Sequence, residues 1–275
     1  MNETFGHALV LGKFYPPHVG HHHLIRAAAG RSARTTVAVL GASVESIPLA
    51  DRVRWLAEEH AGEPGVAVVG DVDDHPIDFH DDRLWALHVG VIRAVLGRRA
   101  IADGDPTGAA VDAVFSSEDY GAELASRLGA KHVAVDPARA AVPVSGTAVR
   151  ADPIGRWDRL APATRAGLAA RVVVVGAEST GTTTLGTALA AELRARGGAF
   201  AGTGLVPEYG RRHTELKLTA ALALDEAADL ESLVWTVSDF VDVAGRQAAD
   251  EDVAARTGGP VVVCDNDPWA ATVWC

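Results

Sequence analysis

The segment that most constrains the fold is residues 12–21, GKFYPPHVGH, where glycines, prolines and histidines lie close together. It follows a short apolar run at residues 8–11 and precedes residues 19–31, whose apolar side chains recur at helical spacing. A strand, a Gly/Pro turn and a helix start form a phosphate-binding layout, because the helix N-terminus offers free backbone N–H groups and the positive end of its dipole. The segment therefore predicts an α/β fold with an anion-binding site at this turn.

The side chains of this segment suit a nucleotide phosphate. His18 and His21 lie about one helical turn apart, so both rings can point at the same anion, and Gly20 lets a phosphate approach the backbone. Lys13 adds a positive charge at the strand end, and no serine or cysteine nucleophile accompanies the histidines. Two weaker interpretations are ordinary structural histidines and a metal site at positions 18, 21, 22 and 23, which lacks a cysteine or carboxylate to complete its ligands.

The first half of the chain alternates short β-branched runs with longer helical patterns. Strands are expected at residues 8–11, 35–40, 66–69, 111–115 and 132–135. Helices are expected at residues 19–31, 51–60, 84–96 and 118–128, with Asp51 as the N-cap of the second helix. The acidic stretch 71–82 reads as a loop at the carboxyl end of a strand, where open α/β sheets bind ligands. This alternation predicts a Rossmann-like, doubly wound parallel sheet in a domain spanning residues 1–160.

A second strand, loop and helix begin after an Ala-rich connector. The apolar run 171–175 leads into GAESTGTT, and residues 184–196 read as a helix. The spacing is that of a P-loop, G-x4-G-K-[ST], with Thr182 in the lysine position. The backbone can still cradle phosphates and Thr183 can still bind magnesium, but a charge-assisted contact worth roughly 1.5–3 kcal/mol is lost. The expected P-loop residues are Gly176, Ser179, Thr180, Gly181, Thr182, Thr183 and Thr184. A Gly/Thr-rich turn that binds no nucleotide is the alternative.

Acidic residues downstream support a P-loop NTPase-like α/β domain at residues 171–275. The apolar run 261–264 ends in Asp265 and Asp267, where a Walker B carboxylate would hold magnesium directly or through water. A strand at residues 204–208 would place Glu208 at a carboxyl edge of the sheet, where it would face a ligand or solvent. Residues 235–256 are expected to form a helix with one apolar face.

Charge and composition restrict the partners. The formal net charge of −11 over 275 residues argues against a general nucleic-acid binder, which would normally present a basic face. No apolar run approaches the roughly 18 residues of a membrane span, and no signal-peptide pattern is present. The two cysteines, Cys264 and Cys275, do not suggest a disulfide framework. We therefore expect a cytoplasmic protein with small-molecule partners, no nucleic acid and no membrane; assembly into a homo-oligomer is left open.

Two motifs carry a family resemblance. The pattern G-K-F-x-P-x-H-x-G-H at residues 12–21 resembles the signature of the HxGH nucleotidyltransferase superfamily, and SGTAVR at residues 145–150 resembles its second signature, S-x-T-x-x-R. An HxGH domain followed directly by a P-loop domain resembles the NadR-type bifunctional enzymes, which join a nicotinamide-nucleotide adenylyltransferase to a ribosylnicotinamide kinase. Stretches 115–121, 142–147 and 264–267 extend the resemblance over most of the chain.

The resemblance implies that the first domain transfers AMP from ATP to nicotinamide mononucleotide and releases pyrophosphate. His18, His21, Lys13 and Arg150 would stabilise the developing charge, and magnesium would bridge the phosphates. Further contacts to the ATP phosphates are expected from residues of both signatures: Gly12, Phe14, Gly20, Ser145, Gly146 and Thr147. In the kinase-like domain, Thr183 and Asp265 would hold magnesium.

The binding residues for the bases are less defined. Trp85 is a candidate to stack on nicotinamide, with a core tryptophan on an amphipathic helix as the equal alternative. Asp119 and Tyr120 are candidates for adenine or ribose binding, with helix capping as the alternative.

The second domain would phosphorylate nicotinamide riboside, and two departures from the family pattern bear on it. Thr182 replaces the P-loop lysine, and residues 171–275 are short for a P-loop kinase, so we expect an incomplete domain with poor kinase activity. There is also no room before Phe5 for the helix-turn-helix domain of some family members. A nucleotide-sensing binding module and an HxGH transferase for another phosphorylated acceptor are the alternative functions, and the fused P-loop domain disfavours the latter.

Overall fold

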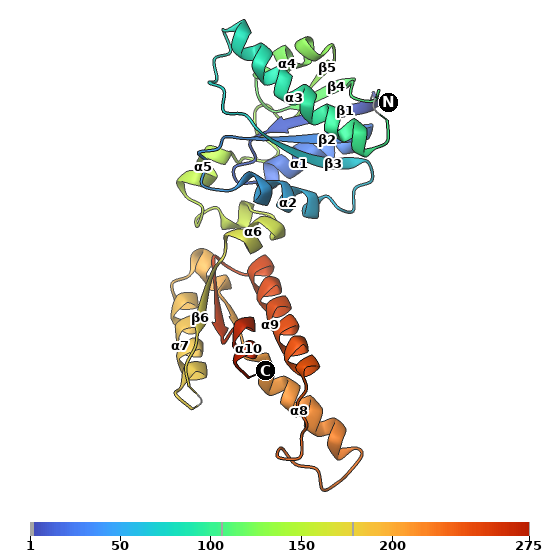
Figure 1. Ribbon diagram of the computed structural model, residues 1–275. Coiled ribbons are helices and arrows are strands. Elements are labelled where there is room, and N and C mark those ends of the chain that lie inside the picture. Colours follow the sequence, from blue (N-terminus) through green and yellow to red (C-terminus); the bar gives the residue numbers. More distant parts are fainter. Residues whose placement is uncertain (1–2, 106, 178, 275) are drawn as a thin grey trace. The chain divides into compact units, whose positions relative to one another are not determined.

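The structure is a computed structural model that describes the chain except for residues 1–2, 106, 178 and 275 (Figure 1). Two residues mentioned above, Glu178 and Cys275, lie outside the described residues. The chain divides into two compact units, residues 1–164 and 165–275, and each is described by itself. Within the described residues, no helix combines the length and the apolar character needed to cross a membrane.

The first unit contains a five-stranded parallel sheet in the order β3-β2-β1-β4-β5. Its strands are β1 (Phe5–Gly12), β2 (Ser32–Gly41), β3 (Val66–Val72), β4 (Ala113–Ser116) and β5 (Lys131–Ala134). The chain proceeds outward from β1 to β3 and then returns to place β4 on the other side of β1. This reversal opens a crevice at the carboxyl ends of β1 and β4, the usual ligand position in such sheets.

Helices cover both faces of this sheet, so the predicted doubly wound α/β fold is confirmed. The first unit contains α1 (Val19–Ala29), α2 (Leu49–Glu59), α3 (Asp82–Ala102), α4 (Tyr120–Leu128), α5 (Gly146–Ala151) and η1 (Trp157–Arg159), and α6 (Pro162–Leu168) crosses into the second unit. Figure 1 shows α3 and α4 on one side of the sheet and α1 and α2 on the other.

The strand sequences explain this double cover. In β1, Ala8 and Val10 pack into one core cluster with Ile25 of α1, whereas Leu9 packs into another with Trp85 of α3. Successive side chains of a strand point to opposite faces, so a strand buried on both faces reads as a continuous apolar run. That is why the apolar runs, rather than alternating patterns, located the strands in the sequence.

The second unit contains a three-stranded parallel sheet in the order β6-β8-β7. Its strands are β6 (Ala170–Val174), β7 (Gly204–Val206) and β8 (Val261–Asp265), and its helices are α7 (Thr182–Ala195), η2 (Gly198–Gly202), α8 (Tyr209–Leu222), α9 (Val237–Thr257), η3 (Pro268–Ala270) and α10 (Ala271–Trp274). β8 therefore lies beside the strand that leads into the P-loop, as the Walker B interpretation requires.

Two local predictions are wrong. Asp51 is not an N-cap, because α2 begins at Leu49 after Pro48, and Asp51 instead pairs with Arg54 at 2.9 Å in the first turn. The strand expected at residues 204–208 ends at Val206, and the following residues begin α8, a helix that the sequence did not reveal. None of the α8 residues is buried, so the helix lacks the apolar periodicity that identifies a helix in sequence.

Candidate functional site

A cavity of about 730 Å³ lies in the first unit at the carboxyl end of the sheet. It is lined by residues from the ends of β1, β2 and β4, from the loop after β3, and from α1, α3 and α5. Residues of both predicted signatures line it, including His18, His21, Ser145 and Arg150. The fold thus brings together two motifs that lie more than a hundred residues apart in the sequence.

His18 and His21 form a stacked pair at this cavity. Their ring centroids lie 3.6 Å apart with an interplanar angle of 19°. The backbone N–H of His18 donates to Nδ1 of His21 at 3.2 Å, which leaves Nε2 as the N–H donor of a neutral His21 ring. His18 is only 4% exposed, yet neither of its ring nitrogens has a hydrogen-bond partner among the described residues. Buried polar atoms are normally paired, so these nitrogens are suited to a ligand.

Both imidazoles are held in the uncharged form. Burial, together with the positive charges of Arg139 and Arg150, lowers the pKa of His18 to about 4. Burial and the neighbouring His18 and His22 rings hold the pKa of His21 well below its usual value. At neutral pH the pair therefore offers N–H donors rather than two fixed positive charges.

The turn before α1 is shaped by small and strained residues. Phe14 is buried with a φ of 47°, and its ring meets His21 edge-on at 4.8 Å. A Cβ on Gly20 would lie 3.0 Å from Cγ1 of Val144 and 3.1 Å from the His18 ring. A larger residue at position 20 would therefore displace either the histidine or the loop beneath it. Gly12 is similarly restricted, since its Cβ would lie 3.2 Å from the Phe14 ring.

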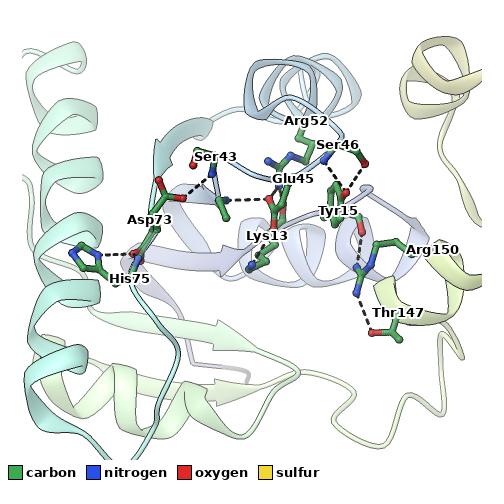
Figure 2. A network of polar contacts seen from close by, with 12 residues as sticks. Lys13, Tyr15, Ser43, Glu45, Ser46, Arg52, Asp73, His75, Thr147 and Arg150 are labelled. Atoms are coloured by element: carbon green, nitrogen blue, oxygen red, sulfur yellow. Dashed lines mark hydrogen bonds and ion pairs between the residues drawn. The ribbon is translucent and has the colours of Figure 1, made fainter.

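The second signature is held against the first. Ser145 caps α5 by accepting a hydrogen bond from the backbone of Ala148, and Arg150 donates to the backbone carbonyl of Tyr15 at 2.8 Å (Figure 2). A Cβ on Gly146 would lie 3.2 Å from Nη1 of Arg150, so this contact favours glycine. Thr147 is exposed and accepts a hydrogen bond from Arg150 at 3.2 Å, so it positions the guanidinium rather than lining the cavity.

Lys13 lies at the cavity within a network that the sequence did not reveal. Its ammonium donates to Glu45 at 2.9 Å, Glu45 also pairs with Arg52 at 2.8 Å, and Arg52 donates to the Lys13 carbonyl at 2.8 Å (Figure 2). Burial opposes ionisation of Glu45, but its hydrogen bonds to Lys13 and to the Ala42 backbone, with the charges of Lys13 and Arg52, lower its pKa overall. Glu45 therefore anchors Lys13 and offsets part of its charge.

Aromatic residues line another part of the cavity. Trp85 is 5% exposed, packs into the core of the first unit, and also lines the cavity, so the two interpretations of this residue are compatible. Its indole N–H donates to the Phe79 carbonyl at 3.1 Å, and the Phe79 ring stacks on Tyr120 at 5.9 Å. The Tyr120 hydroxyl donates to the Leu11 carbonyl at 3.3 Å, and burial raises its pKa to about 12.

The structure does not bring Asp119 to the cavity. This residue is exposed, directly precedes α4 and makes no side-chain cap hydrogen bond, so the capping alternative fails as well. Arg139, which the sequence analysis missed, does line the cavity and donates to Glu118 at 2.7 Å. Its loop is curled by Asp136, whose carboxylate accepts backbone hydrogen bonds from residues 140–142. Neither residue belongs to a recognisable motif, so only the fold reveals them.

The described residues of the predicted P-loop form a tight turn before α7. Ser179 and Gly181 adopt left-handed conformations with φ of 64° and 90°, and Thr182 begins α7. A Cβ on Gly176 would lie 2.7 Å from Oγ1 of Thr180, which itself donates to the Ala177 carbonyl. The turn therefore needs glycine at positions 176 and 181. Thr184 lies in the first turn of α7 and is exposed.

A magnesium-type oxygen pair lies beside this loop. The Thr183 hydroxyl donates to Oδ2 of the buried Asp265 at 2.6 Å, and a hydroxyl with a carboxylate is a ligand set that suits Mg²⁺. Asp267 instead caps η3 by accepting from the Ala270 backbone, so the structure gives it a structural contact. Glu208 accepts from Asn266 at 3.4 Å, which places it at the end of β8.

Together the two units define a class of protein by their fold, a Rossmann-like parallel α/β sheet followed in the chain by a P-loop-type α/β unit. Residues 171–275 match the family model described as an AAA domain. Over 97% of its length the chain is 24% identical to the trifunctional NAD biosynthesis/regulator protein NadR of Escherichia coli (strain K12), and equally to that of Salmonella typhimurium. It spans 62% of the length of these relatives.

Two solved structures of NadR have the same fold. The complex with NR superposes with a TM-score of 0.63 at 20% identity, covering 99% of this chain and 71% of the other. The complex with NAD and AMP-PNP superposes with a TM-score of 0.61 at 18% identity, covering 99% of this chain and 72% of the other. The resemblance to NadR inferred from the motifs is confirmed.

Proposed function

We propose that the first unit transfers AMP from ATP to nicotinamide mononucleotide, giving NAD and pyrophosphate. The observation that carries this proposal is the buried His18 ring, which has no hydrogen-bond partner among the described residues, is stacked on His21 and lines the same cavity as the α5 signature. The similarity to NadR, with its complexes with NR and with NAD and AMP-PNP, supports the choice of substrates.

The proposed reaction needs positioning and charge stabilisation rather than covalent catalysis. The 5′-phosphate of the acceptor attacks the α-phosphorus of ATP in line, the bond to the bridging oxygen breaks, and pyrophosphate leaves. His18 and His21 donate N–H groups to the phosphate oxygens, and those contacts strengthen as negative charge develops. Lys13, Arg150 and the N-terminus of α1 hold the outer phosphates, with Ser145 fixing the start of α5. A magnesium ion bound to ATP would supply further positive charge to the triphosphate.

The aromatic part of the cavity is proposed to bind the acceptor base. Phe79, Trp85 and Tyr120 offer ring faces and edges, which suit a planar pyridinium ring. The cavity volume of about 730 Å³ falls in the range of ordinary small-molecule sites.

For the second unit we propose phosphate binding at the P-loop, with magnesium on Thr183 and Asp265 and nicotinamide riboside as the acceptor. Glu208 and Asp265 are the candidates for the base that accepts the hydroxyl proton. Thr182 leaves the β- and γ-phosphates without the usual lysine, so we expect weak kinase turnover.

The test is a panel of acceptors offered to the full chain with ATP and magnesium, with release of pyrophosphate as the readout. We expect turnover with nicotinamide mononucleotide and formation of NAD in equal amount. Turnover only with another phosphorylated acceptor would replace the proposed substrate. Tight ATP binding without pyrophosphate release for any acceptor would favour a nucleotide-sensing module and contradict the proposal.

A further inference from the structure

Three side chains at the cavity, none of them part of either signature, form a compact cluster. Asp73 directly follows β3, His75 lies two residues later, and His88 lies in the second turn of α3. Nδ1 of His75 lies 2.8 Å from Oδ1 of Asp73, and Nδ1 of His88 lies 2.6 Å from Oδ2. One ligand atom from each residue lies within 4.8 Å of the others. Two imidazole nitrogens and a carboxylate therefore converge on one small volume.

The orientation of His88 is fixed from its far side. Its Nε2 lies 3.1 Å from the carbonyl oxygen of Pro76, which can only accept a hydrogen bond. Nδ1, which faces Asp73, donates to the carboxylate, and a metal ion bound at Nδ1 would displace that proton while Nε2–H keeps its bond to Pro76. Histidines that bind metals commonly donate their other N–H to a backbone carbonyl in this way. The Asp73 carboxylate is also oriented, because Oδ1 accepts from the backbone N–H of His75 at 3.2 Å.

We propose that Asp73, His75 and His88 bind a divalent transition-metal ion of the Zn²⁺ or Co²⁺ type. Two imidazoles with one carboxylate suit these ions, whereas Mg²⁺ prefers oxygen ligands alone. Bonds of about 2.0–2.1 Å at tetrahedral angles separate ligand atoms by roughly 3.3 Å. The histidine–Asp73 separations of 2.8 and 2.6 Å would open by less than about 1 Å, and the two histidine nitrogens, which lie within 4.8 Å of each other, would move closer. His75 lies on a loop and is 38% exposed, so it can move.

This site is separate from the proposed magnesium–ATP position. Figure 2 places the Asp73–His75 pair and the Thr147–Arg150 pair on opposite sides of the view. His88 lies one turn beyond Trp85 on α3, so the metal would lie at the aromatic part of the cavity. All three protein ligands line the cavity, so a bound ion would be accessible to a ligand in it. The metal site does not depend on the proposed function, and its test needs no nucleotide.

The experiment titrates the chelator-treated full chain with Co²⁺, followed by visible absorption and by calorimetry, with Zn²⁺ as competitor. We expect one tight equivalent with the absorption bands of an imidazole-bound ion, displaced by Zn²⁺ but not by excess Mg²⁺. His75→Gln and His88→Gln should each weaken binding by more than the roughly 10–100-fold typical of an outer-shell partner. His80→Gln, a change of an exposed histidine in the same loop, should bind as the wild type does.

Folding is checked separately by circular dichroism and melting of each variant without metal. His75 is half exposed, so His75→Gln is expected to keep its fold and to give a decisive result. Failure of the wild type to bind Co²⁺, or tight binding that persists in both His75→Gln and His88→Gln, would overturn the proposal. The cluster would then be an ordinary group of hydrogen bonds that ties α3 to the end of β3.

Discussion

At the scale of single residues, the kinetics of a His21 variant can distinguish a role in binding ground-state ATP from a role in catalysis. Its Nδ1 is occupied by the His18 backbone, so only Nε2 remains to act on the substrate. Replacing His21 with Ala should lower kcat by about 100-fold or more, the usual loss for one oxyanion donor, with little change in KM for ATP. Steady-state kinetics of pyrophosphate release measure both constants.

The exposed His80 gives the matched control, and His80→Ala should behave as the wild type. If His21→Ala raises KM as strongly as it lowers kcat, the ring binds only ground-state ATP. Unchanged kinetics in this variant would remove His21 from the mechanism.

Arg150 is predicted to act through the shape of its guanidinium. One nitrogen already donates to the Tyr15 carbonyl and another to Thr147, and the group lies 5.3 Å from the centre of the Tyr15 ring. A lysine offers a point charge without this planar fork, so Arg150→Lys should raise KM for ATP by about tenfold. Unchanged constants for ATP would show that Arg150 only joins the two signatures.

At the scale of elements, the P-loop and α7 lack the usual lysine. Thr182→Lys should therefore increase nicotinamide riboside kinase activity, because the restored contact is worth roughly 1.5–3 kcal/mol. Formation of ADP in the presence of nicotinamide riboside is the measurement, since adenylyl transfer releases pyrophosphate instead. Thr187→Lys places the same charge at an exposed position of α7 beyond the P-loop and serves as the control. Equal activity of both variants and the wild type would contradict the prediction.

The elements also show where sequence reasoning succeeds. The two signatures, the apolar strands buried on both faces, and the Thr183–Asp265 pair follow from local patterns or from strand order. The Glu45 network and the Asp73–His75–His88 cluster do not, because each joins residues that meet only after the chain folds. Helix α8 was missed because its exposed surface leaves no apolar period to recognise.

At the scale of the whole molecule, buried neutral histidines make the first unit sensitive to acid. Burial, followed by the neighbouring His60 and Arg26, lowers the pKa of His22 to about 3, and Nδ1 of His22 lies 2.9 Å from Nε2 of His60. Between about pH 6.5 and pH 3 the unfolded chain binds a proton that the folded chain excludes. The free energy of unfolding should therefore fall with decreasing pH, by up to roughly 1.4 kcal/mol per pH unit for each such histidine.

Urea unfolding between pH 7 and pH 5, followed by tryptophan fluorescence with one transition for each unit, measures this slope. His22→Gln should flatten the pH dependence of the first unit, while His80→Gln should keep it. A slope that is the same in both variants would mean that His22 is not among the groups responsible.

The pairing of β1 with β4 has a consequence for how the molecule assembles. Ala8 lies opposite Ala113, so this contact must close a long stretch of chain that includes β2, β3 and three helices. Such distant contacts form slowly, because loop-closure entropy is lost before the pairing stabilises the sheet. The cavity is lined by Leu11, near the end of β1, and by Ser116, the last residue of β4, so it forms only once this pairing is complete. A ligand bound in the cavity should therefore lower the unfolding rate of the sheet and leave its folding rate unchanged, because it binds only after the sheet has formed.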